Sequence, residues 1–498
     1  MACAADVLWA ALAAGGTRAA VRDAAIELSA AQLLQDVRAR RARLEALGAR
    51  RVALALDNGA DWVAWDLALL ASGRVCVPVP GFFSPQQQAH VLDSAGIDTL
   101  IGDPIVAARV EGFEETEEGI FQRVPRTLPA LPAGTVKITY TSGTTGQPKG
   151  VCLDAGAQLA VARSLVEVST ACGVARHLSV LPLATLLENV GGVYAAFLAG
   201  ACVDLVPQAA LGMTGASGFD VARFIRSLHE HRPHSLILLP QLLLALVAAA
   251  EGGIKLPDSL RFVAVGGARV SPALLVRAEA LGLPIFEGYG LSECASVVCV
   301  NTPGARRIGT VGRPLAHAAV RLADDGEVEV RGARMLGYLG EPAPASDWLP
   351  TGDLGHFDDG FLVLHGRKKH QFVTAFGRNV NPEWVEAELT QQAPIAQAWV
   401  HGEALAANVA VIVARGAERS DADIDAAIAS ANAALPDYAR VQRWLRADEA
   451  FSFHNDLLTA NGRLRRMALA ERYLARIGGA DPDSGPAPFL PIEQEIDA

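Results

Sequence analysis

The sequence lacks the cysteine patterns of a disulfide framework or a zinc site. Its 498 residues include seven cysteines, which is an odd number, and no C-x-x-C pair occurs among them. We therefore expect reduced, mostly buried thiols in a cytosolic protein. The cysteines are Cys3, Cys76, Cys152, Cys172, Cys202, Cys294 and Cys299.

Long hydrophobic runs and a signal peptide are missing as well. The longest apolar runs, such as 236–250, are shorter than the ~20 residues that a membrane-spanning helix requires. At the N-terminus, Asp6 interrupts the apolar stretch and no basic residue precedes it, which favours an ordinary first helix over a signal peptide. The sequence therefore predicts a cytoplasmic protein without an integral membrane segment.

Charged residues are few, and basic residues are the minority among them. They make up 19% of the chain, and the formal net charge is −11. Nucleic-acid binding needs a basic face, so nucleic acid is not expected as the main partner. A hydrophobic content of 51% excludes disorder of the whole chain. A nucleotide substrate stays compatible with this composition, because it needs only local positive charge.

The first two-thirds of the chain alternate short apolar runs with helical stretches. This rhythm predicts parallel sheets flanked by helices in a large N-terminal lobe, and thus an α/β fold. After about residue 309, short strands punctuated by Gly, Pro and Asp indicate a small β-rich subdomain. The expected domains are a large domain (1–367), a mobile α+β C-terminal domain (368–477) and a disordered tail (478–498). Strand-like runs lie at 52–56, 75–79, 136–140, 178–181, 203–206, 236–239 and 262–265.

The strongest motif is the stretch TYTSGTTGQPKG at 139–150. Here a strand runs into a loop of hydroxyl residues and glycines, which let backbone N–H groups approach an anion closely. Lys149 adds a mobile charge, so the motif predicts a phosphate cradle. It is not the common P-loop, because Pro148 precedes the lysine and Gly150 follows it. The other expected phosphate-binding residues are Thr141, Ser142, Gly143, Thr144, Thr145 and Gly146.

At these residues the sequence resembles the adenylate-forming superfamily, which includes acyl-CoA synthetases, peptide-synthetase adenylation domains and luciferases. Further stretches resemble family motifs in the expected order, and the likeness is greatest to bacterial long-chain acyl-CoA synthetases. These stretches are Gly288-Tyr289-Gly290-Leu291-Ser292-Glu293, Gly312-Arg313-Pro314, Thr351-Gly352-Asp353, Gly366-Arg367-Lys368-Lys369 and Leu458-Thr459-Ala460-Asn461-Gly462-Arg463.

The resemblance implies ATP and Mg²⁺ as cofactors and an acyl-adenylate intermediate. A carboxylate and a triphosphate are both anions, so their reaction needs charge neutralisation and alignment. Glu293 and Thr144 are the expected Mg²⁺ residues, and Asp353 with Arg367 would bind the ribose. The segment around adenine would comprise Gly267, Ala268, Gly288, Tyr289, Gly290 and Ser292.

The C-terminal motifs imply a hinge and a second half-reaction. The resemblance places the hinge at Lys369 and a pantetheine tunnel near Gly377, with Lys149, Glu293 and Arg463 as catalytic residues. Two positions depart from the family pattern. Arg463 stands where the family has a catalytic lysine. An arginine keeps the positive charge but carries it on a planar guanidinium group rather than a compact ammonium. His370 stands where the family more often has an acid, and the sequence assigns it no role.

The substrate and the acceptor are less sharply indicated. The stretch LPLAT at 181–185 looks more like fatty-acid CoA ligases than peptide-synthetase domains. No charged residue suggests a partner for a substrate amino group, so an apolar acyl or aryl acid is favoured. CoA is the expected acceptor, and an acyl carrier protein with its phosphopantetheine, or an amine, is the alternative. A non-catalytic acyl or nucleotide sensor remains a third interpretation because of Arg463.

Overall fold

The computed structural model describes residues 5–141, 148–214, 218–416, 418–459 and 462–477. They form two compact units, which we call unit 1 (Met1–Thr351 and His356–Val363) and unit 2 (Gly352–Gly355 and Leu364–Ala498). The boundary predicted after residue 367 stays a prediction. The tail predicted at 478–498 lies outside the described residues.

The larger sheet of unit 1 holds nine strands among the described residues. Its six central strands, β1, β11, β10, β14, β15 and β16, run parallel, and antiparallel strands extend both edges. In sheet order the strands are β18 (Arg313–Pro314), β17 (Ser296–Val300), β16 (Ile285–Leu291), β15 (Phe262–Val265), β14 (Ser235–Leu238), β10 (Arg176–Ser179), β11 (Cys202–Leu205), β1 (Ala19–Arg22) and β2 (Glu27–Ser29).

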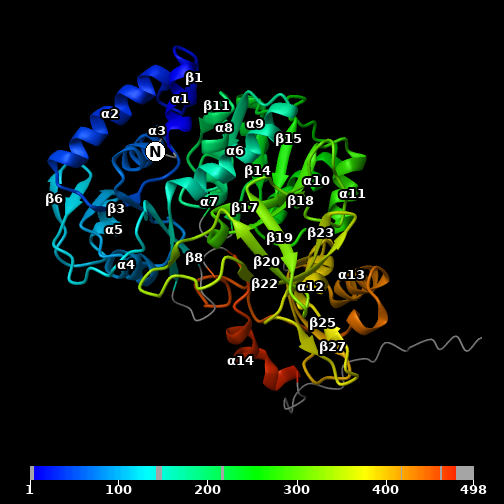
Figure 1. The fold of residues 1–498 in the computed structure, drawn as a ribbon. Coiled ribbons are helices and arrows are strands. Elements are labelled where there is room, and N and C mark those ends of the chain that lie inside the picture. The colour runs from blue at the N-terminus through cyan, green and yellow to red at the C-terminus, as the bar shows by residue number, and fades with distance from the viewer. Residues whose placement is uncertain (1–4, 142–147, 215–217, 417, 460–461, 478–498) are drawn as a thin grey trace, which may run out of the picture. The chain divides into compact units, whose positions relative to one another are not determined.

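The second sheet of unit 1 holds eight strands in the described part of the chain. Its centre, β8, β4, β3 and β5, is again parallel. Figure 1 shows α2 (Ala30–Ala46) and α3 (Ala60–Ser72) side by side, and α3 packs on β3 and β4. In sheet order the strands are β21 (Gly337–Tyr338), β9 (Lys149–Leu153), β8 (Lys137–Thr141), β4 (Val75–Pro78), β3 (Arg51–Ala55), β5 (Thr99–Gly102), β7 (Ile120–Gln122) and β6 (Glu114–Glu117).

The remaining strands are short or belong to smaller sheets. One sheet has the order β19 (Ala318–Leu322), β20 (Glu327–Gly332), β22 (Leu349–Asp358) and β23 (Phe361–Arg367). β12 (Met213–Thr214) pairs with β13 (Gly218–Phe219) in unit 1, and β24 (Phe372–Val373) pairs with β25 (Asn379–Val380) in unit 2. Unit 2 also contains the sheet β26 (Ile395–His401), β27 (Asn408–Ala414) and β28 (Val441–Arg446).

Side-chain caps fix where several helices begin. α2 and α4 (Pro85–Ser94) each begin with a capping box. The side chain of the capping serine accepts from the backbone N–H of the glutamine three residues later, and the glutamine side chain accepts from the backbone N–H of the serine. The other helices of unit 1 are α1 (Asp6–Gly15), α5 (Pro104–Ala107), α6 (Ala155–Ala171), α7 (Leu186–Glu188), η1 (Asn189–Tyr194), α8 (Ala195–Leu198), α9 (Val221–His231), α10 (Pro240–Glu251), α11 (Pro272–Ala280) and η2 (Ser292–Cys294). Those of unit 2 are α12 (Pro382–Thr390), α13 (Asp421–Ala433), η3 (Asp437–Ala439) and α14 (Arg466–Ile477).

The predicted α/β fold class is confirmed, and most predicted strands coincide with observed ones. A difference occurs after β10, which ends at Ser179 rather than at the predicted residue 181. The backbone N–H of Leu181 donates to Glu188 Oε2 at 2.9 Å, so a side chain replaces the neighbouring strand as its partner. The six cysteines within the described ranges are free thiols, and Cys3 lies outside those ranges. None of the helices that the structure describes has the length and apolar character to cross a membrane.

A buried charged network joins β8 to the π-helical segment η1. Lys137 Nζ lies 2.9 Å from Asp66 Oδ1, and both side chains are 2% exposed. Tyr194 donates its hydroxyl to Asp66 Oδ2 at 2.7 Å, and Asn189 Nδ2 donates to the same oxygen at 3.0 Å. Lys137 also donates to the Asn189 side chain. Since β8 leads directly into the predicted phosphate loop, this network anchors the strand from which that loop begins.

Replacing Lys137 by methionine should lower the free energy of unfolding by about 3–5 kcal/mol, because Asp66 would keep a buried charge without its cation. Adding Asp66→Asn should recover part of this loss. The exposed Lys255→Met provides a matched control, with an expected change of less than about 0.5 kcal/mol. Urea denaturation followed by tryptophan fluorescence measures all three. Equal midpoints for Lys137→Met and Lys255→Met would contradict the prediction.

Candidate functional site

The strand–loop–strand unit of the predicted phosphate cradle forms an antiparallel hairpin. β8 and β9 pair so that Thr141 lies opposite Lys149. The two ends of the loop are therefore neighbours, with Lys149 exposed and Thr141 half-buried. The predicted residues Ser142, Gly143, Thr144, Thr145 and Gly146 lie outside the described residues.

Lys149 and Glu293 approach the same tyrosine, Tyr338. Lys149 Nζ lies 5.1 Å from the centre of the Tyr338 ring, and the Tyr338 hydroxyl donates to Glu293 Oε1 at 2.9 Å. Tyr338 reaches this position because β21 pairs with β9, two residues beyond Lys149. Sequence reasoning missed Tyr338, since nothing local distinguishes it from a core tyrosine. The structure thus brings the predicted phosphate-binding lysine and the predicted metal-binding carboxylate together.

The Lys149 ammonium already has an anionic partner in the protein. Its Nζ lies 3.0 Å from Glu341 Oε1, and the two side chains are 51% and 48% exposed. Such an exposed pair contributes at most about 1 kcal/mol, because water screens both charges. Lys149 can therefore exchange Glu341 for a more highly charged phosphate at little cost. Glu341 is a second residue that the sequence did not indicate.

Glu293 lies in the short helix η2, in a turn with unusual backbone geometry. Ala295 and Ser296 follow it with φ angles of 57° and 129°, which non-glycine residues rarely adopt. The Glu293 carbonyl accepts from the Met335 backbone N–H at 2.6 Å. The backbone of Glu293 is thus fixed by Met335, and its carboxylate is fixed by the Tyr338 hydroxyl. One carboxylate fits Mg²⁺, which usually takes one or two carboxylates together with phosphates and waters.

The predicted adenine segment follows the carboxyl end of β15 and the parallel part of β16. A Cβ on Gly266 would lie 2.9 Å from the carbonyl oxygen of Gly288, so these two segments touch through their backbones. Gly267 has φ +81°, and both Gly267 and Ala268 are exposed. The structure therefore brings this loop next to Gly288 and the partly exposed Tyr289.

Glycine is required at position 290 because β17 approaches its backbone closely. β16 pairs with β15 up to Glu287 and with β17 from Gly288, with an irregularity between Tyr289 and Gly290. A Cβ on Gly290 would overlap the Ser296 carbonyl. Ser292 follows as the first residue of η2 and is partly buried. Close backbone approach, rather than side-chain chemistry, thus explains this glycine.

Glu287 is a buried carboxyl group next to this segment. Burial raises its pKa to about 8, against the opposing effects of the Arg269 charge and the Val270 backbone N–H. A carboxyl group with this pKa is largely protonated at neutral pH. Sequence reasoning gave Glu287 no role, because its burial is decided by the pairing of β16 with β15.

In unit 2, Asp353 and Arg367 form an ion pair. Arg367 Nε lies 2.7 Å from Asp353 Oδ1, and the Asp353 side chain is 8% exposed. The pair is fixed by the backbone bond from Lys368 N–H to the Gly352 carbonyl at 2.8 Å. A carboxylate has about four acceptor positions, so pairing with arginine is compatible with accepting ribose hydroxyls.

In unit 2 the charge of Arg463 also acts on Lys369. Burial lowers the pKa of Lys369, and the charges of Arg367 and Arg463 lower it further against Glu383 and Asp353. The Arg463 N–H donates to Thr459 Oγ1 at 3.0 Å, and the Thr459 N–H donates to the Arg463 carbonyl at 2.6 Å. Gly377 lies at the turn between β24 and β25 with φ +71°. A Cβ there would meet nothing within 4 Å.

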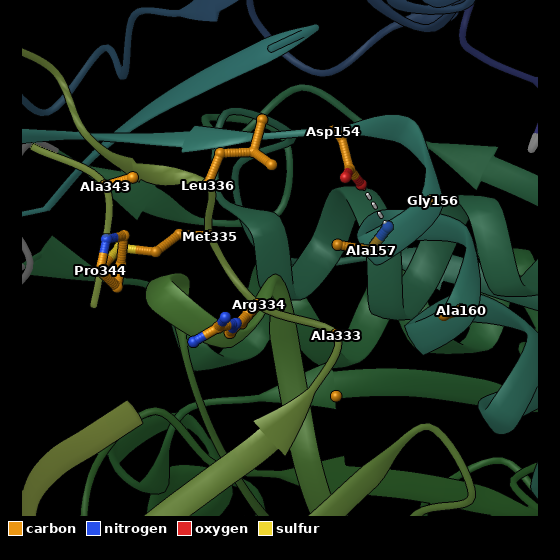
Figure 2. Close-up of a pocket in the computed structure, with 11 residues that line it drawn as sticks. Asp154, Gly156, Ala157, Ala160, Ala333, Arg334, Met335, Leu336, Ala343 and Pro344 are labelled. Carbon is orange, nitrogen blue, oxygen red and sulfur yellow. Dashed lines mark hydrogen bonds between the residues drawn. The ribbon is translucent and has the colours of Figure 1, made fainter. Parts of the chain in front are cut away.

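A cavity of about 490 Å³ lies between the first turn of α6 and the segment 332–336 of unit 1 (Figure 2). Asp154 accepts from the Ala157 N–H at 2.6 Å, and Arg334 lies 3.0 Å from Asp347. The charged groups of the cavity are thus paired within the protein. Met335 lines this cavity and also contacts the candidate site, because its N–H donates to the Glu293 carbonyl.

The comparisons with known proteins agree on one family. The model of the AMP-binding enzyme family matches residues 8–339. A long-chain-fatty-acid–CoA ligase of Mycobacterium bovis, FadD15, is 26% identical over 570 residues, covering 91% of this chain and 92% of that protein. An indoleacetate–CoA ligase of Aromatoleum aromaticum is 27% identical over 433 residues, covering 77% and 82%.

Solved structures show the same fold. The anthranilate CoA ligase AuaEII, crystallised with anthranoyl-AMP, has a TM-score of 0.80 and 21% identity, covering 96% of this chain and 98% of that one. The family match spans well over half of the chain and includes Lys149, Glu293 and Tyr338. The resemblance that the sequence motifs indicated is therefore confirmed, and the chain belongs to the AMP-binding enzyme family.

Proposed function

We propose that the protein is an ATP-dependent acid–thiol ligase that works through an acyl-adenylate. In the first step a carboxylate oxygen attacks the α-phosphorus of ATP, and pyrophosphate leaves. In the second step the thiol of CoA attacks the acyl carbon, and AMP leaves. The observation that carries this proposal is the grouping of Lys149, Tyr338 and Glu293 beside the two ends of the hydroxyl- and glycine-rich loop.

Charge neutralisation is the task of this group in the first step. Lys149 would leave Glu341 and donate to phosphate oxygens, together with the backbone and hydroxyl groups of 141–146. Mg²⁺, held by Glu293 and Thr144, would withdraw charge from the phosphates. The Tyr338 hydroxyl would keep the Glu293 carboxylate oriented. The Tyr338 ring would hold the Lys149 ammonium above its face.

The remaining nucleotide contacts follow from the placement of backbone and carboxylate groups. The loop containing Gly267 and Ala268, beside Gly288 and Tyr289, offers backbone and ring surface for adenine. Gly290 and Ser292 shape the turn that leads to Glu293. In unit 2, Asp353 would accept from the ribose hydroxyls while Arg367 holds it in place.

Arg463 would supply positive charge where the negative charge develops during adenylation. Unit 2 would then rotate about a hinge at Lys369, and the turn at Gly377 would form part of a tunnel for the pantetheine thiol. The open space around a Cβ at Gly377 is compatible with a close approach of such a thiol arm. Hinges of this kind are a few loop residues that absorb the backbone change.

For the substrate we propose an apolar acyl or aryl acid, used in the cytoplasm. Support comes from the LPLAT stretch and from the absence of a charged partner for an amino group in the sequence motifs. The two named relatives act, by their names, on long-chain fatty acids and on indoleacetate. A carrier-protein thiol or an amine as acceptor, or binding without catalysis, are the alternatives that the following experiment separates.

Exchange of pyrophosphate into ATP should depend on an added acid. We expect exchange with at least one member of a panel of fatty and aromatic acids, since only a chain that forms an acyl-adenylate reverses the step. Adding CoA, then a phosphopantetheinylated carrier protein, then an amine should identify the acceptor by acid-dependent AMP release. Absence of exchange with every acid would reject the enzymatic proposal and favour a sensor.

Tyr338→Phe should lower kcat/KM for MgATP in the exchange assay about tenfold, the scale of one hydrogen bond to a charged group. The ring beneath Lys149 is kept in this variant, so the effect reports on the hydroxyl bond to Glu293. Tyr438→Phe, which removes the hydroxyl of an exposed tyrosine of unit 2, is the matched control. Identical kcat/KM values for the two variants would show that the hydroxyl has no role.

Arg463→Ala should lose about a hundredfold in exchange rate, the scale of one lost transition-state contact. Arg463→Lys should retain or raise the rate, because it keeps the charge with a compact ammonium. Steady-state exchange kinetics of the three proteins measure this. Equal rates for arginine, lysine and alanine at this position would reject a role in adenylation.

A further inference from the structure

His370, to which the sequence assigned no role, contacts the first turn of α12. Its Nδ1 lies 2.6 Å from Glu383 Oε1. Burial acts to raise the pKa of Glu383, but the hydrogen bond from His370 and the charges of Arg466, His370 and Arg367 outweigh it, leaving a pKa of about 2. Glu383 is thus ionised at any assay pH. An ionised carboxylate only accepts hydrogen bonds, so His370 Nδ1 is the donor.

The same histidine closes the backbone turn that contains Lys369. The His370 N–H donates to the Arg367 carbonyl at 3.0 Å, and the Gln371 N–H donates to it at 3.2 Å. Glu383 is fixed in turn, because its N–H donates to Asn381 Oδ1 at 3.0 Å. The ring of His370 therefore ties the turn of the predicted hinge to the start of α12.

α12 also holds the segment that follows Arg463. Arg466, the first residue of α14, donates to both carboxylate oxygens of Glu386 at 2.9 and 2.5 Å. Glu386 Oε1 accepts from the Val400 N–H at 2.9 Å as well, which fixes this carboxylate against β26. Bidentate pairs of this kind fix geometry as well as charge. Arg463 lies three residues before this anchor.

Several cations lie near the hinge turn, and their mutual repulsion favours fixed carboxylates beside them. Besides burial, the charges of Arg367 and Arg463 both act on Lys369 and lower its pKa. Asp353 and Glu383 are the anions that offset them, and Glu383 is also close to Arg466. Loss of the His370 bond would leave Glu383 free to turn toward any of these cations.

We propose that His370 is a positioning residue. Its bond to Glu383 holds the hinge turn on α12 and, through Arg466, sets the place of Arg463 for adenylation. The catalytic part of this proposal rests on the proposed function, whereas the coupling between His370 and Arg463 does not.

Hydrogen exchange read by mass spectrometry tests the coupling without any substrate. In the full-length protein, His370→Ala should speed amide exchange severalfold in peptides covering 462–466, and Glu383→Gln should do the same. His370→Asn, which keeps a donor near the position of Nδ1, should restore most of the protection. His454→Ala replaces an exposed histidine of unit 2 and should change nothing. Unchanged protection in both His370→Ala and Glu383→Gln would overturn the proposal.

Kinetics test whether the coupling acts through Arg463. His370→Ala should lower kcat of pyrophosphate exchange about tenfold and change KM for ATP less than about twofold. In an Arg463→Ala background the same substitution should have no further effect, because residues acting as one unit are not additive. An equal loss in both backgrounds would overturn the proposal. A wild-type protein without exchange would instead count against the proposed function, and the amide-exchange comparison would still decide the coupling.

Discussion

Two candidate cations, Lys149 of unit 1 and Arg367 of unit 2, are each held by a carboxylate of their own unit. Lys149 pairs with Glu341 and Arg367 pairs with Asp353. In a chain with a net charge of −11, these cations must be kept in position without being neutralised permanently. The exposed Lys149 pair is weak enough to exchange for a phosphate, whereas the more buried Asp353 pair fixes the geometry of its own segment.

A second kind of charge pair serves the scaffold rather than the site. Lys137 and Asp66 are buried together with Tyr194 and Asn189. Removing one partner of such a pair is costly because the other keeps its charge in a dry interior. Arg466 and Glu386 play the comparable part in unit 2, where they hold the beginning of α14. The buried pairs thus fix β8, which leads into the predicted phosphate loop, and the start of α14, which follows Arg463 in the chain.

Backbone approach explains why glycines gather in the candidate site. At Gly290 a side chain would overlap the neighbouring strand, and at Gly266 it would press on the carbonyl of Gly288. Within its seven residues β16 passes from a parallel to an antiparallel partner, and glycines occupy the positions where its backbone is approached most closely. The result is that Glu293 follows directly after the segment proposed to bind adenine.

The sequence by itself determined the fold class, the family and the positions of most strands, because buried parallel strands read as short apolar runs and the motifs are local. It also placed Lys149, Glu293, Asp353, Arg367 and Arg463 as candidates. Only the tertiary structure decided their partners. Tyr338 and Glu341 meet Lys149 through the pairing of β21 with β9, which joins segments nearly two hundred residues apart, and no local pattern encodes such a pairing. The partner of His370 was likewise decided by the packing of the turn at residues 367–371 on α12, a contact that the local sequence pattern does not indicate.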